Sequence, residues 1–290
     1  MSATPLTGFD ALYRRRRTFD RVMTGIMVLA VLVAVVPLFL ILFYLLREGI
    51  GGLSLELLTE DPNRPGRAGG GVRNSIVGSA IMVGLGVAIG VPIAIGCGVF
   101  LAEFGRNRMG LVVRFLVDVM AGIPSITVGL FIYGLVVLPQ GKFTAFAGGL
   151  ALAIIFLPIV ARITEEMVLL VPRSVREAAL GLGAPRWRTV VQIVLPTALP
   201  GIITGILLAL SRIAGEAAPL LFTALGNQFY STDIFEPMDA LPLRIFVYAV
   251  GPYDYWHEQA WAMSLLLVGV ILVISIAVRL VFGARVTVRQ

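Results

Sequence analysis

The chain has 290 residues, of which 58% are apolar and only 14% are charged, and its mean hydropathy is +0.94. Soluble globular proteins carry about 45–50% apolar and about 25% charged residues, so this composition excludes an ordinary soluble domain and also disordered and collagen-like chains. The single cysteine, Cys97, excludes a disulfide-rich fold, and the net charge of +6 must be placed along the chain before it can be interpreted.

Long stretches that lack Asp, Glu, Lys and Arg divide the chain into segments of membrane-spanning length. A span needs about 20 apolar residues, and helices satisfy their own backbone hydrogen bonds in lipid. The alternating pattern of an outer-membrane barrel is absent. We therefore expect an all-α integral membrane protein with six transmembrane helices, at 22–46, 74–102, 119–141, 143–161, about 197–225 and 259–278.

The basic residues lie mostly on one side of these six spans. An even number of spans places both termini on the same side, where the termini and loops hold sixteen basic residues, against six on the other side. Because Lys and Arg are enriched in cytoplasmic loops, both termini are predicted to be cytoplasmic. The positive charge is therefore a topology signal, and we expect no nucleic-acid partner.

The N-terminal segment 1–21 is predicted to be a short cytoplasmic arm that ends in the sequence YRRRRTFDR. Such an arm suits anionic lipid headgroups, and a plain stop-transfer anchor is the favoured interpretation. The first span exceeds the about 7–15 apolar residues of a cleaved signal peptide, so we expect it to be retained. Two long extracytoplasmic segments, 47–73 and about 226–258, are candidate docking surfaces.

The cytoplasmic segment between the fourth and fifth spans predicts a short helix–turn–helix. Ser174 and Glu177 have the spacing of a capping box at a helix start. Gly181 and Gly183 predict the end of that helix. A second helix is predicted over 186–194, before the Leu-Pro pair.

The same segment contains the EAA-x3-G-x9-I-x-L-P signature, with every fixed position and every spacing intact. The chain thus resembles the permeases of binding-protein-dependent ABC importers, which implies the type I importer fold. By this resemblance the loop of about 163–196 couples the permease to a cytoplasmic ATPase. The residues that would contact the ATPase are Glu177, Ala178, Ala179 and Gly183.

The chain itself lacks a phosphate-binding loop of the Walker A type, which needs a Lys followed by Ser or Thr. The only lysine, Lys142, is followed by Phe143. We therefore expect a transport subunit and not an enzyme. It should hold no cofactor, and a separate ATPase should bind ATP and Mg²⁺.

Two charged residues, Arg212 and Glu216, fall near the middle of the fifth predicted span and would share one helix face. An arginine there costs about 2.5–3.5 kcal/mol on insertion scales, so such residues usually face a cavity or the bundle interior. Its guanidinium suits phosphate or carboxylate oxygens. Either Arg212 faces the translocation path and Glu216 holds it in place, or the two form a structural ion pair. Ser125 and Thr127, beside Pro124 in the third span, are further candidates for the path.

Other segments are similar to the permeases of phosphate importers of the Pst type, over about residues 49–283. They are GGGVRNSIVGS at 69–79, AGIPSITVGLFIYG at 121–134, LPIVARITEEM at 157–167 and GEAAPLLFTALGNQFYSTDIFEPM at 215–238. Ala217 departs from this pattern, which usually has Thr after Gly-Glu.

This resemblance implies an importer of inorganic phosphate in the bacterial inner membrane. Its transmembrane domain would cover residues 74–283, followed by a cytoplasmic tail at 284–290. The partners would be a homologous second permease, two copies of an ATPase, an extracytoplasmic phosphate-binding protein and membrane lipids. The alternative is an importer of another oxyanion, molybdate or sulfate.

Overall fold

The computed structural model describes residues 7–287, with the side chains of residues 13–278 and 280, and this part of the chain is helical without a named strand. It divides into two units, Met1–Glu48 and Gly49–Gln290. Five of its helices are long and apolar enough to cross a membrane, or six when one bent pair of helices is counted as a span. The predicted all-α membrane fold is confirmed.

Helix α1 (Thr7–Gly52) contains the first predicted span. It begins at Thr7, so the arginine-rich part of the predicted arm belongs to the same helix; residues 1–6 lie outside the described part. The apolar side chains along its middle are exposed to the surroundings. A surface of this kind suits lipid and not water.

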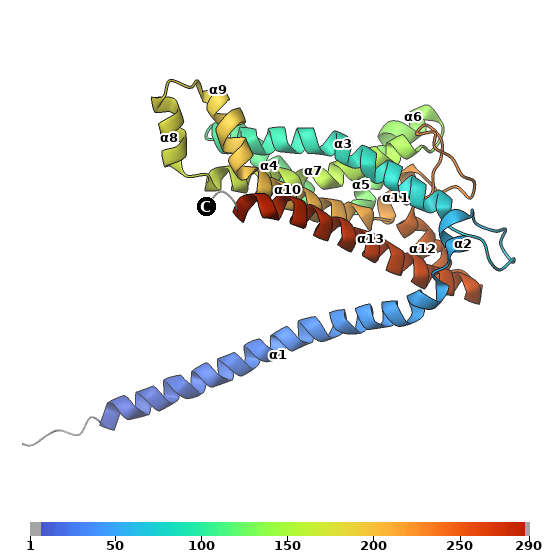
Figure 1. Cartoon of the computed structure of the whole chain (residues 1–290), viewed down its shortest axis with the longest axis horizontal. Helices are drawn as coiled ribbons and strands as arrows, with labels where there is room; N and C mark the ends of the chain where they lie inside the picture. The colour runs from blue at the N-terminus through green and yellow to red at the C-terminus, as the bar shows by residue number, and fades with distance from the viewer. Residues whose placement is uncertain (1–6, 288–290) are drawn as a thin grey trace, which may run out of the picture. The chain divides into compact units, whose positions relative to one another are not determined.

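Three long helices form the centre of the second unit: α3 (Arg73–Phe104), α7 (Ala145–Leu170) and α10 (Leu195–Ala214) (Figure 1). Helices α3 and α7 run parallel, because Gly86 lies against Leu152, Gly90 against Phe156 and Gly98 against Thr164. Glycines let the two backbones approach closely, as is common between membrane helices. Helix α7 is the most buried of the spans.

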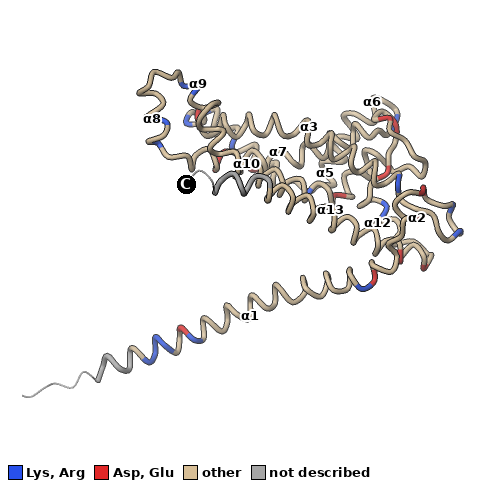
Figure 2. The backbone as a smooth tube through the Cα atoms, in the orientation of Figure 1, with Lys and Arg blue, Asp and Glu red and all other residues tan. Residues whose placement is uncertain are grey.

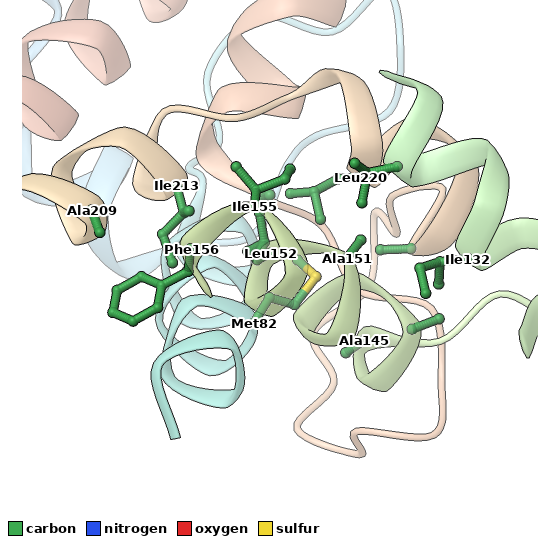
Figure 3. Packing of buried hydrophobic residues seen from close by; sticks show 14 of the residues in the cluster. Met82, Ile132, Ala145, Ala151, Leu152, Ile155, Phe156, Ala209, Ile213 and Leu220 are labelled. Carbon is green, nitrogen blue, oxygen red and sulfur yellow. The ribbon is translucent and has the colours of Figure 1, made fainter. Parts of the chain in front are cut away.

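The apolar core surrounds α7 (Figure 3). Leu152 and Phe156 of α7 are fully buried, and they pack with Met82 of α3 and Ile213 of α10. Leu220 of the short helix α11 (Ala218–Thr223) belongs to the same cluster. The core therefore fixes the positions at which α10 ends and α11 begins.

The third predicted span, 119–141, is not one continuous helix. Helix α4 (Arg108–Gly122) ends before Pro124, and α5 (Ser125–Ile132) continues after a bend of 104° between Arg108–Gly122 and Ser125–Gln140. Proline has no N–H and disfavours helical dihedrals at the residue before it. Ile123 accordingly has an extended ψ of 129°. The sequence predicted a single span over these residues and did not reveal the break.

Two π-helical segments each precede a proline. Segment η1 (Tyr133–Val137) leads into α6 (Leu138–Gln140), which contains Pro139, and η2 (Val190–Val194) leads to Pro196. In η2 the N–H of Leu195 donates to the carbonyl of Val190, five residues back. A proline cannot make the regular bond, and its ring crowds the preceding turn, so a wider turn relieves the conflict.

The second helix of the predicted helix–turn–helix does not end before Pro196, so that prediction is wrong. Helix α9 (Arg186–Thr189) runs through η2 into α10 and forms one span, Arg186–Ala214. That span stops at Ala214 and does not continue to residue 225, because Gly215 ends α10. The remaining helices are α2 (Leu55–Thr59), α8 (Arg173–Gly181), α12 (Leu241–Ala249) and α13 (Asp254–Thr287).

Charged residues of the second unit gather towards its two ends (Figure 2). At one end lie α8, α9 and the C-terminal ends of α3 and α7, which we call the α8 end. At the other lie α2, α12 and the N-terminal end of α3, which we call the α12 end. The apolar middle between them has the arrangement expected of helices that cross a hydrocarbon layer.

Candidate functional site

Arg212 lies in the last turn of α10, where that helix stops inside the bundle. Across α7 and α10, which are antiparallel, Gly201 faces Met167 and Gly205 faces Ile163. The same spacing carried along α10 brings Arg212 level with Phe156, close to the middle of α7. A cationic side chain at a helix C-terminus is favoured by the helix dipole. The fold thus presents a guanidinium at mid-depth on the end of an interrupted helix.

Glu216 does not share a helix face with Arg212, so that expectation is wrong. It follows the end of α10, where the N–H of Gly215 donates to Arg212 O and that of Glu216 donates to Ile213 O. Arg212 Nε lies 3.9 Å from Glu216 Oε1, and the Arg212 side chain is 54% exposed. In the described part of the chain Arg212 makes no side-chain hydrogen bond. The pair is loose, and most donors of Arg212 are free to meet another group.

Ser125 and Thr127 stand at the start of α5, directly after the break at Pro124. Ser125 is half-buried and Thr127 is exposed. Helix α5 packs against α11, where a Cβ on Gly129 would lie 2.7 Å from Pro219 Cα. The two interrupted spans are therefore neighbours. Among the described residues, however, neither Ser125 nor Thr127 makes a side-chain hydrogen bond, with Arg212 and Glu216 or otherwise.

A chain of four charged residues joins α4 to α7. Arg114 donates from Nε and Nη2 to Glu165 Oε1, at 2.9 and 2.5 Å. Arg162 Nη1 contacts Glu165 Oε2 at 3.2 Å, and Arg162 Nη2 contacts Asp118 Oδ1 at 2.9 Å. Asp118 and Arg114 lie four residues apart on α4 but pair with residues of α7 and not with each other. The signal missed was the i, i+3 spacing of Arg162 and Glu165 at the end of an apolar run.

At the α8 end, the helix that carries the EAA signature is exposed. Glu177, Ala178 and Gly183 are exposed, whereas Ala179 is buried and faces the protein. Gly183 has φ of +84°, and its N–H donates to Leu180 O, which closes the helix. Three of the four residues are therefore accessible to a partner, and Ala179 packs α8 against the rest of the chain.

The predicted capping box at Ser174 and Glu177 is absent from α8. Pro172 occupies the N-cap position and supplies no side-chain hydrogen bond. Because the helix begins at Arg173, Ser174 already lies inside its first turn and cannot cap it. Glu177 is left without a side-chain hydrogen bond or ion pair in the described part of the chain, and is available to a partner.

A buried polar cluster at the α12 end was not expected from the sequence. Asp239 Oδ2 accepts from Ser75 Oγ at 2.5 Å and from Arg244 Nε at 2.6 Å. Arg244 also donates to the carbonyl of Asn227 at 3.3 Å. Burial raises the pKa of Asp239 above its usual value, and Arg244 and Ser75 oppose that rise. The cluster ties the segment after α11 to the start of α3.

Residues 90–286 match the family described as binding-protein-dependent transport system inner membrane component. The chain is 44% identical to the phosphate transport system permease protein PstA of Yersinia pestis, over 93% of this chain and 92% of that protein. It is 43% identical to PstA of Haemophilus influenzae, over 92% and 95%. It is 35% identical to PstA 1 of Mycobacterium tuberculosis strain H37Rv, over 94% and 90%.

The fold is similar to that of a chain in the inward-facing MetNI methionine ABC transporter. The TM-score is 0.59 over 73% of this chain and 94% of that chain, with 22% sequence identity. A second crystal form of the same transporter gives a TM-score of 0.57. At this level of identity the similarity concerns the fold alone.

Proposed function

The chain belongs to the family of binding-protein-dependent transport system inner membrane components, and from this premise we propose that it is the permease of an ATP-driven importer of inorganic phosphate. It is a transport component and not itself an enzyme. The structural observation that carries the proposal is the exposed guanidinium of Arg212 at the end of an interrupted helix. We infer the substrate from the relatives, which are named as phosphate transport permeases.

Arg212 would meet phosphate in the translocation path. Its guanidinium offers five donors in a planar fork that matches phosphate oxygens. A purely structural ion pair would bury both partners and bring them closer than 3.9 Å. Glu216 is close enough to weaken a permanent complex with an anion, and a transport site must release what it binds. Ser125 and Thr127 would add hydroxyl groups where the neighbouring span is broken.

An energy source is needed because phosphate is an anion. Moving one negative charge into a cell against the membrane potential costs about 2.3 kcal/mol per 100 mV. A passive pore would therefore favour efflux. Coupling to ATP hydrolysis would supply the required energy. Because the chain's own sequence has no Walker A loop, a separate subunit would hydrolyse the ATP.

The coupling would use the exposed surface of α8. Glu177, Ala178 and Gly183 are presented outwards and would contact a cytoplasmic ATPase, while Ala179 packs the helix against the permease. The ATPase, in two copies, would hold ATP and Mg²⁺. A homologous second permease would complete the path in the bacterial inner membrane, and an extracytoplasmic phosphate-binding protein would deliver the anion at the α12 end.

The test is uptake of radiolabelled phosphate into proteoliposomes that contain the complete complex, with ATP inside. Unlabelled phosphate should compete, and molybdate and sulfate at equal concentration should not. If molybdate or sulfate competes more strongly than unlabelled phosphate, the proposal is wrong, and the alternative, an importer of another oxyanion, takes its place.

A further inference from the structure

Arg176 links the exposed helix α8 to two membrane-spanning helices. Its Nη1 is paired with Glu103 Oε1 in the last turn of α3. Its Nη2 donates to the carbonyl of Val168, in the last turn of α7, at 2.6 Å. The two charged side chains are only 20% and 12% exposed, respectively, so water screens this pair less than a surface pair. One guanidinium therefore holds three helices together at the α8 end.

The electrostatics of the two helix ends favour this contact. Glu103 lies at the C-terminal end of α3, where a carboxylate is disfavoured by the helix dipole. Val168 lies at the same end of α7, where carbonyl groups lack helical partners. A cation between them compensates for both. Neutralising Arg176 would leave the Glu103 carboxylate and the Val168 carbonyl without their shared cation.

Other attachments of α8 are few. Ala179 is its only buried residue. In the described part of the chain its other polar side chains, Arg173, Ser174 and Glu177, make no hydrogen bond or ion pair. A pocket of about 100 Å³ opens beside the helix, lined among others by Glu103, Arg176, Leu180 and Val190. Apart from its packing on α9 and η2, α8 is therefore linked to the spans chiefly through Arg176.

We propose that Arg176 and Glu103 form a positioning pair that transmits movement of α8 to α3 and α7. The inference rests on the proposed function, in which α8 receives the movement of an ATPase. Neither residue touches the solute or ATP. Their role is to make α8 move together with the spans behind it, so that hydrolysis is converted into transport.

The first measurement is phosphate uptake per ATP hydrolysed, in proteoliposomes with the complete complex. Glu103→Gln and Arg176→Gln should each lower this ratio about tenfold while ATP hydrolysis continues. Because both act through one contact, the double variant should be no worse than Arg176→Gln alone. Glu166→Gln removes an exposed carboxylate, which has no ion pair among the described residues, from the same end of α7. It should leave the ratio unchanged.

The second measurement needs no phosphate. Cys97 is the only cysteine of this chain and lies on α3, before Glu103. In a complex whose other subunits lack cysteine, ATP should change the rate at which maleimide labels Cys97. Glu103→Gln and Arg176→Gln should abolish that change in assembled complexes.

An equal response to ATP in the wild type and Glu103→Gln would overturn the pairing role, as would additive losses in the double variant. A wild type without any ATP response at Cys97 would also overturn it, because α3 would then not move. Failure of the wild type to import phosphate, with a normal Cys97 response, would count against the proposed substrate and leave the pair supported.

Discussion

Arg244 Nε lies 2.6 Å from Asp239 Oδ2 in a buried ion pair, and the Ser75 hydroxyl donates a hydrogen bond to the same carboxylate oxygen. The hydrogen bond from Ser75 joins Asp239, in the segment before α12, to the first turn of α3. Removing one partner of a buried pair leaves the other charge uncompensated, and such losses are large. This relationship leads to the first prediction.

Asp239→Asn should destabilise the permease by about 3–5 kcal/mol, because Arg244 would remain buried without its carboxylate. A thermal unfolding curve of the detergent-solubilised protein measures the change. Asp61→Asn is the matched control, since it breaks the more exposed pair with Arg73 and should shift the midpoint much less. Equal shifts of the unfolding midpoint in the two variants would show that the buried cluster stabilises the protein no more than the exposed pair does.

Arg212→Gln should lower phosphate uptake about tenfold to about a hundredfold, as expected for loss of hydrogen bonds between a cation and an anion. Hydrolysis of ATP and assembly with the partner subunits should persist, because Arg212 lies far from α8. Arg212→Lys should retain part of the uptake, since the charge remains and only the fork geometry is lost. Uptake by Arg212→Gln at the wild-type rate would remove this residue from the path.

Pro196→Ala should uncouple transport from hydrolysis. Without the proline, Val190–Val194 can return from a π-helix to an α-helix, and a one-residue change of register rotates α9 by about 100° relative to α10. We expect uptake per ATP to fall about tenfold. Pro200→Ala removes a proline from the same span without an associated π segment, and should leave coupling intact. Identical coupling in the two variants would contradict the role given to η2.

Gly98→Ala should destabilise the contact between α3 and α7. The added Cβ would lie 2.5 Å from Thr164 Cβ, so the helices must separate, at a cost of about 1–3 kcal/mol. On the same helix Gly96 has open space around it, and Gly96→Ala should be neutral or slightly stabilising. Thermal unfolding of both variants tests the prediction, which fails if Gly98→Ala is as stable as Gly96→Ala.

Long apolar segments were predictable from the sequence because length and hydropathy depend on local composition, but the third and fifth predicted spans differ from the helices found. The all-helical membrane fold and the end of α8 at Gly181 and Gly183 followed from such local signals. The 104° bend at Pro124 was not predictable, because prolines also occur in membrane helices that continue through them.

The contacts between distant segments were not predictable in this way. Arg114 and Asp118 lie four residues apart on α4, yet each pairs with a residue of α7. Asp239 and Arg244 looked like residues of an exposed connection and are buried. These outcomes depend on which helices become neighbours, and single-sequence spacing carries no information about that.

The burial of α7 has a consequence for how the protein is made. Its neighbours α3, α4 and α10 belong to the same chain, so the most shielded helix acquires its surroundings without help from another subunit. Membrane insertion and internal packing can then precede recruitment of partners, and a cell that lacks those partners should still accumulate a folded permease.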